Sequence, residues 1–202
     1  MDQCAQAAVQ VLDATGVRAP AVLLGTSWGG FVAPRIAALA PERLSGLVLT
    51  NTSAERGTSA ERAKASLLTK LLAVSALDQV TARLIVSGLI APETRRREQR
   101  LGTDLAEQFL AWERRRFIAT VRSVLVDRDP VLGALPELKV PALIVSGKED
   151  HTLPSFHSQR MAQQLPDTRH IEVSGAGHLV PLEAPQRANP LILDFLQDLP
   201  RD

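Results

Sequence analysis

The sequence contains one cysteine, Cys4, and no tyrosine among its 202 residues. A single cysteine cannot form a disulfide within the chain, and it excludes metal clusters built on several thiolates. A chain without disulfides fits a reducing compartment, so we expect a cytoplasmic protein. The 23 Lys and Arg residues nearly balance the 22 Asp and Glu residues, which leaves a net charge of +1. Because bulk charge draws proteins to nucleic acids and to anionic membranes, this balance predicts neither partner.

Long hydrophobic runs are absent as well. The first ten residues, MDQCAQAAVQ, lack the basic start and the apolar centre of a signal peptide. The apolar-rich region 67–90 is interrupted too often for a membrane span, by Lys70, Asp78, Gln79 and Arg83. Neither a phosphate-binding glycine loop nor a metal-binding spacing occurs, so we expect no cofactor and no metal site.

Short apolar runs alternate with amphipathic segments along most of the chain. Apolar runs at Ala21–Leu24, Leu47–Thr50 and Ala142–Val145, and the segment RHIEVSG, are typical of strands. The first of these is typical of a strand buried on both faces. Helical spacing occurs at 2–15, 31–40, 156–164 and 188–196. This alternation predicts an α/β fold, with a parallel sheet, helices on both faces and right-handed crossovers.

One stretch departs from the alternation. Between Thr52 and Leu135 the apolar residues follow a helical period and no strand pattern appears. The sequence therefore predicts two parts: an α/β core made of residues 1–51 and 136–202, and a helical cap insertion made of residues 52–135.

The first strand is followed by Gly25-Thr26-Ser27-Trp28-Gly29, which matches the Gly-x-Ser-x-Gly nucleophile elbow. In such a turn the serine adopts a strained backbone conformation, and bulk two residues away would collide, which explains Gly25 and Gly29. The turn lifts the Ser27 hydroxyl off the sheet, and the N–H groups at the start of the next helix face the site. Ser27 is therefore the candidate nucleophile, with a plain glycine-rich turn as the alternative.

A serine hydroxyl is a poor nucleophile without a base. His178 lies in the small-residue loop SGAGHLVP after the last strand, where it can reach the carboxyl end of the sheet, and we predict it as the base. Asp150, in IVSGKEDHTLP after the preceding strand, is the predicted orienting acid. Other histidines and carboxylates fit less well: His151 in a loop, His157 on a helix surface, His170 within a strand, Glu149 beside Asp150, and Asp127, Asp129 and Asp167 as solvated surface groups.

The motifs LLGTSWGG, ALIVSGKEDHTLP and GAGHLVPLEAP occur in this order, and with them the whole chain resembles the α/β-hydrolase superfamily. Within it, the chain is similar to the 3-oxoadipate enol-lactonase group. The resemblance implies cofactor-free hydrolysis of a small carboxylic ester or lactone through an acyl-enzyme intermediate. It makes Ser27, Asp150 and His178 a catalytic triad. It also makes the Trp28 N–H one oxyanion donor. Serine at the elbow, in place of aspartate, argues against dehalogenase and epoxide hydrolase chemistry.

Members of this superfamily carry further strands before the elbow, and a His-Gly loop there supplies a second oxyanion N–H. No His-Gly pair precedes Ser27, so we expect an N-terminally truncated hydrolase, and the alternative function is a catalytically impaired remnant without hydrolase activity. Without neighbours on both sides, the strand Ala21–Leu24 would be an apolar sheet edge. Such an edge offers a route for self-association.

Overall fold

The computed structural model describes residues 1–18 and 20–200. In this part of the chain, one parallel sheet has the strand order β1-β2-β3-β4: β1 is Ala21–Thr26, β2 is Leu44–Thr50, β3 is Ala142–Gly147 and β4 is Thr168–Val173. Leu49 pairs with Gly25 on β1 and with Ile144 on β3. Because neighbouring strands are parallel, the chain returns to the same end of the sheet after each strand, and it does so through helices. The predicted α/β class and parallel sheet are confirmed.

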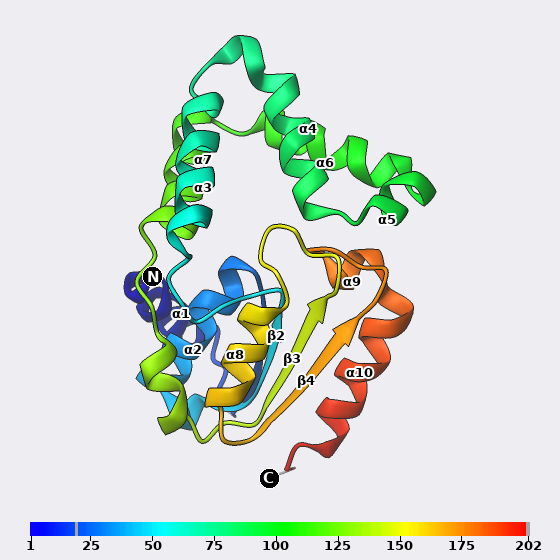
Figure 1. The fold of residues 1–202 in the computed structure, drawn as a ribbon. Coiled ribbons are helices and arrows are strands. Elements are labelled where there is room, and N and C mark those ends of the chain that lie inside the picture. Colours follow the sequence, from blue (N-terminus) through cyan, green and yellow to red (C-terminus); the bar gives the residue numbers. More distant parts are fainter. Residues whose placement is uncertain (19, 201–202) are drawn as a thin grey trace.

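Helices cover both faces of the sheet (Figure 1). One layer holds α1 (Asp2–Ala14), α2 (Trp28–Leu39) and α8 (Phe156–Gln164), and the other holds α9 (Val180–Glu183) and α10 (Pro185–Asp198). Leu49 and Ile144 belong to the apolar core beneath α2 and α8. Val48 and Val145, one position away on the same strands, belong to the core beneath α10. The alternation of side chains along each strand therefore supplies both cores.

In the described structure β1 is an edge strand. It pairs with β2 alone, and the side chain of Leu24 is 56% exposed. By contrast, every residue of β3 is buried. The expectation that Ala21–Leu24 is buried on both faces is therefore wrong. The run has the apolar composition of a central strand, but β1 has a neighbour on one side only, and part of its surface is uncovered. It is the apolar sheet edge that the sequence also predicts.

Residues 59–126 form helices that lie past the end of the sheet towards which β3 and β4 point (Figure 1). We call them the helical block. In it, α3 (Ser59–Leu72) packs against α7 (Arg114–Val121) and the π-helical turn η3 (Arg122–Val126), while α4 (Asp78–Leu89) packs against α6 (Gln99–Ala111). Shorter helices along the chain are η1 (Pro41–Arg43), η2 (Ser75–Leu77), α5 (Pro92–Arg97) and η4 (Leu132–Glu137). None of the helices described is both long and apolar enough to cross a membrane.

Candidate active site

Ser27 occupies the sharp turn between β1 and α2. Its backbone has φ 51° and ψ −110°, in the left-handed half of the map that residues other than glycine rarely adopt. Two backbone hydrogen bonds hold the turn: the Ser27 N–H donates to the Thr50 carbonyl at 2.9 Å, and the Phe31 N–H donates to the Ser27 carbonyl at 3.1 Å. The residue is partly exposed, and its hydroxyl does not cap α2. The hydroxyl is therefore not sealed inside the core.

Two glycines, Gly25 and Gly30, allow this turn to close. The motif suggests Gly25 and Gly29, so one of the two differs. A Cβ on Gly25 would lie 2.6 Å from the backbone carbon of Gly29, and a Cβ on Gly30 would lie 2.5 Å from the side chain of Thr52. A Cβ on Gly29 would meet nothing within 4 Å. The steric explanation holds for Gly25 and is wrong for Gly29, because position 29 faces open space. The close approach of α2 to Thr52, in the loop after β2, instead requires Gly30.

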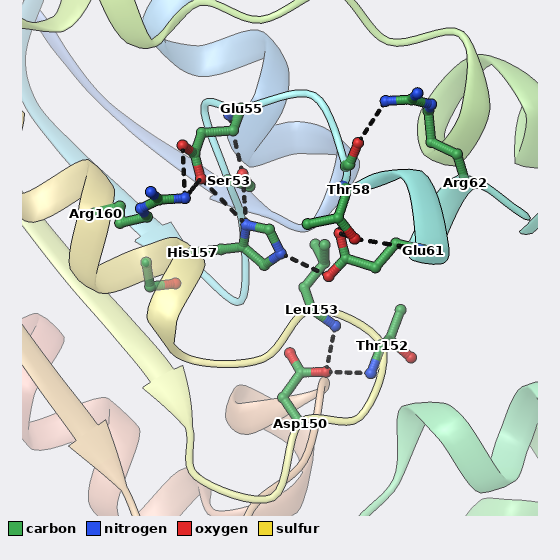
Figure 2. Close-up of polar contacts among 12 residues, drawn as sticks. Ser53, Glu55, Thr58, Glu61, Arg62, Asp150, Thr152, Leu153, His157 and Arg160 are labelled. Carbon is green, nitrogen blue, oxygen red and sulfur yellow. Dashed lines mark hydrogen bonds and ion pairs between the residues drawn. The ribbon is translucent and has the colours of Figure 1, made fainter. Parts of the chain in front are cut away.

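Asp150 and His178 come from separate loops and are in contact. The Nδ1 atom of His178 lies 2.7 Å from Oδ2 of Asp150, and the two residues are 2% and 3% exposed. The other oxygen of Asp150, Oδ1, accepts the backbone N–H groups of Thr152 and Leu153, each at 2.8 Å (Figure 2). The two backbone N–H groups thus hold one oxygen of the carboxylate, while the other oxygen contacts the imidazole.

This contact determines which nitrogen of His178 can act as a base. An ionised carboxylate only accepts hydrogen bonds, so Nδ1 carries a proton and donates a hydrogen bond to Asp150. The lone pair of a neutral imidazole is then on Nε2. Within residues 1–18 and 20–200 no hydrogen bond joins His178 to the Ser27 hydroxyl. The structure brings Asp150 and His178, the predicted acid and base, into contact. Catalytic contacts that are open in a free enzyme can close around substrate.

The N–H of Trp28 is the first of α2 and follows Ser27 directly. In the part of the chain that the structure describes, this N–H has no acceptor. The four leading N–H groups of a helix lack partners within the helix, and they carry its positive partial charge. This donor is therefore available to an oxyanion that forms at Ser27.

Asn51 is a further residue of the site that the sequence reasoning missed. It follows β2 directly, is completely buried and has φ 48°. Its Nδ2 donates to Oδ2 of Asp150 at 2.9 Å and to the Gly177 carbonyl at 3.0 Å. Asn51 therefore ties the acid to the loop that carries His178. The available signal was its place at the carboxyl end of a buried strand, where parallel sheets gather functional side chains.

His157 was expected on a helix surface, and the structure shows otherwise. It is 1% exposed at the start of α8, and its ring faces Ser53 and Glu55 on one side and Glu61 on the other (Figure 2). Its Nε2 is 2.9 Å from Oε1 of Glu61, and its Nδ1 is 3.4 Å from Oγ of Ser53 and 3.5 Å from Oε2 of Glu55. Ser53 is fully buried, so this serine cannot meet a substrate. The cluster joins the helical block to the α/β core.

Among residues 1–18 and 20–200, no side-chain hydrogen bond or ion pair joins the remaining candidate groups to His178. His170 lies on the edge strand β4, 3.0 Å from Oγ of Ser146, and burial lowers its pKa while Glu172 partly offsets that effect. Glu149 accepts the Ala176 N–H at 3.1 Å, and Asp127 pairs with an arginine on the surface. Within the described ranges no three His, Cys, Asp or Glu side chains gather in a way that could hold a metal ion.

Comparison with known proteins places these features in a family. Residues 1–185 match the family described as alpha/beta hydrolase fold. The chain is 28% identical over 201 residues to the polyketide synthase ThaQ of Burkholderia thailandensis, covering 98% of this chain and 10% of the synthase. It is 27% identical over 197 residues to 2-hydroxy-6-oxo-6-phenylhexa-2,4-dienoate hydrolase of Comamonas testosteroni, covering 96% of this chain and 68% of the hydrolase.

Solved structures show the same fold. The enol-lactonase from Burkholderia xenovorans LB400 superposes with a TM-score of 0.84 at 20% sequence identity, covering 97% of this chain and 72% of the lactonase. At this identity the superposition shows the fold alone. The chain thus spans a tenth of ThaQ and about seven tenths of the lactonase.

Proposed function

The chain belongs to the alpha/beta hydrolase fold family, and from that premise we propose that it is a serine hydrolase that cleaves a small carboxylic ester or lactone. The observation that carries the proposal is the contact at 2.7 Å between Asp150 and His178. In this contact Nδ1 of His178 donates a hydrogen bond to the carboxylate, so the lone pair on Nε2 can accept a proton. Ser27 supports the proposal from the end of β1, at the same edge of the parallel sheet, where the left-handed turn that a nucleophile elbow requires holds it.

The mechanism follows from these groups. Nε2 of His178 takes the proton of the Ser27 hydroxyl while Oγ attacks the carbonyl carbon of the ester. The N–H of Trp28 donates to the oxygen that becomes negative, a contribution that is typically about 3 kcal/mol for one such donor. His178 then returns its proton to the leaving alcohol, which leaves the acyl group on Ser27. Water, activated by the same imidazole, releases the carboxylic acid.

Asp150 serves the mechanism by holding the imidazole. Its negative charge stabilises the imidazolium that forms in each step, and its hydrogen bond keeps the ring in the tautomer that presents Nε2 as a base. The hydrogen bonds from Thr152, Leu153 and Asn51 fix the carboxylate, so little reorganisation is needed when charge appears on the ring.

The substrate class is proposed from the nucleophile and the relatives. A serine forms an ester with an acyl group, which water can cleave, so a carboxylic ester or lactone suits the site. The sequence similarity to a hydrolase of a dienoate favours a small organic acid derivative as the substrate. The net charge of +1 gives no support for a nucleic-acid partner.

Burst kinetics on p-nitrophenyl acetate test the proposal. If Ser27 becomes acylated, the native chain releases one equivalent of p-nitrophenol faster than the following turnover, and Ser27→Ala removes both phases. Ser59→Ala is the matched control, because Ser59 is exposed at the start of α3 and lies outside the proposed site. Hydrolysis that survives unchanged in Ser27→Ala would contradict the proposal.

A further inference from the structure

Glu183 is a buried carboxylate that the proposed mechanism does not use. It ends the short helix α9 and is 1% exposed. Its Oε1 accepts the N–H groups of Gly177 at 2.9 Å and Leu179 at 3.0 Å, and its Oε2 accepts the N–H of Ala91 at 2.8 Å. Three backbone donors from two distant parts of the chain therefore converge on one side chain.

Two of these donors flank the proposed base. Gly177 and Leu179 are the residues on either side of His178, and both bond to the same oxygen. The loop is tightly enclosed at this point, because a Cβ on Gly177 would lie 2.7 Å from the backbone nitrogen of Ala91 and 3.1 Å from Oε1 of Glu183. Glu183 therefore fixes the peptide from which the imidazole projects.

The third donor comes from the helical block. Ala91 lies between α4 and α5, and the nearby Leu89 carbonyl accepts the N–H of His178 itself at 2.8 Å. Residues 89–91 are thus hydrogen-bonded to the His178 loop in two ways, directly through the Leu89 carbonyl and indirectly through Glu183. A shift of this segment would move the backbone of the base.

We propose that Glu183 is a positioning residue for His178, and that it couples the placement of the imidazole to residues 89–91 of the helical block. The inference rests on the proposed function, since it assigns Glu183 a part in presenting the base of that reaction. Glu183 acts through His178 and has no contact with Ser27 among its hydrogen bonds.

A carboxylate suits this position better than an amide of the same shape. Three N–H groups need acceptors on both side-chain oxygens, and a carboxylate offers lone pairs on each. A glutamine has one acceptor oxygen, and its NH₂ group would face at least one backbone N–H. That donor would be left buried and unpaired, so the loop would shift to relieve the contact.

The variant Glu183→Gln tests this, measured as steady-state kinetics on p-nitrophenyl acetate. A misplacement of about 1 Å at a catalytic group costs about a hundredfold in rate, so we expect kcat to fall 10- to 100-fold. KM should stay within about twofold, because Glu183 does not meet the substrate. The matched control is Glu93→Gln, an exposed glutamate in α5 that should leave both constants unchanged.

A second variant removes one donor and leaves the Glu183 residue in the sequence. Ala91 has φ −56°, which proline adopts, so Ala91→Pro replaces the N–H that bonds Oε2 by a ring carbon, and Oε2 has to move away. This variant should also lower kcat with little change in KM, and it guards against a Glu183→Gln chain that fails to fold.

A spectroscopic readout separates this inference from the proposed function. The Nδ1 proton of His178, shared with Asp150 at 2.7 Å, should give a far-downfield ¹H NMR signal that is absent in His178→Gln. Loss of that signal in Glu183→Gln supports positioning even if the native chain hydrolyses no ester, in which case only the proposed function fails. If the signal persists and kcat stays within twofold in both Glu183→Gln and Ala91→Pro, the inference is overturned.

Discussion

Replacing Glu61 by glutamine tests how the helical block is held to the α/β core. Oε2 of Glu61 accepts the N–H of Thr58 at 2.7 Å and its hydroxyl at 2.9 Å, which completes a capping box at the start of α3. Oε1 lies 2.9 Å from Nε2 of the buried His157, on α8 of the core layer. One carboxylate therefore caps the start of the helix and ties it to the core.

The size of the effect follows from the bond to His157. Glutamine can keep the capping contact with Thr58, because glutamate and glutamine both occur at this place in a capping box. It cannot keep a charged acceptor for Nε2, and hydrogen bonds to charged groups contribute about 1.5–3 kcal/mol. We expect Glu61→Gln to lower the free energy of unfolding by about 2 kcal/mol at neutral pH.

The pH dependence provides a second check. Burial raises the pKa of Glu61, but the hydrogen bonds from His157 and Thr58 outweigh it, so the pKa lies below the ordinary value of 4.5. A carboxyl with a lowered folded-state pKa stabilises the fold fully above its unfolded pKa, and it loses that contribution as pH falls through the folded value. The difference between native and Glu61→Gln chains should therefore narrow below about pH 4.5.

Urea unfolding followed by circular dichroism, at neutral and acid pH, measures both effects. Glu107→Gln is the matched control, because Glu107 is an exposed carboxylate of the helical block on α6. If Glu61→Gln unfolds at the same urea concentration as Glu107→Gln at pH 7, the Glu61–His157 bond does not stabilise the fold. A difference in unfolding free energy between these two variants that grows as the pH is lowered would also contradict the prediction.

Three further predictions concern the site and the sheet. Asp150→Asn should lower kcat by about 10⁴-fold in ester hydrolysis with a small change in KM, because the wrong imidazole tautomer is favoured; a loss under tenfold contradicts this role. In thermal unfolding, Gly30→Ala should destabilise the chain, because its Cβ would meet Thr52 at 2.5 Å. Gly29→Ala, in open space, should be neutral or stabilise the chain by up to about 1 kcal/mol. The reverse order of stabilities would contradict the packing at Gly30. We also propose that the chain associates with itself through the edge of β1, so Leu24→Lys should shift sedimentation towards monomer, and equal sedimentation of both chains would exclude that edge.

The parts of the molecule that the sequence predicts are those set by local pattern. Apolar runs of the right length predicted the strands, and their alternation with helices predicted a parallel sheet. Because the carboxyl ends of parallel strands share one edge, the loops after β3 and β4 were expected to deliver Asp150 and His178 to one place. The structure brings these two side chains into contact.

The parts that could not be predicted depend on contacts between distant segments. His157 is buried because Ser53 and Glu61, 104 and 96 residues away along the chain, provide polar partners for its ring. Glu183 meets Ala91 across 92 residues, and neither residue type signals such a contact. The tightness at Gly30 likewise comes from Thr52 in the loop after β2, which a motif limited to residues 25–29 does not include.

The central claim is that Ser27 is a nucleophile activated by His178, and covalent labelling tests it most directly. The native chain is treated with a fluorophosphonate and digested, and the modified peptide is located by mass spectrometry. We expect a single adduct on Ser27 that is absent from Ser27→Ala, strongly reduced in His178→Gln and retained in Ser59→Ala. A native chain that carries no adduct, or carries it on a different residue, would show that Ser27 is not an activated nucleophile.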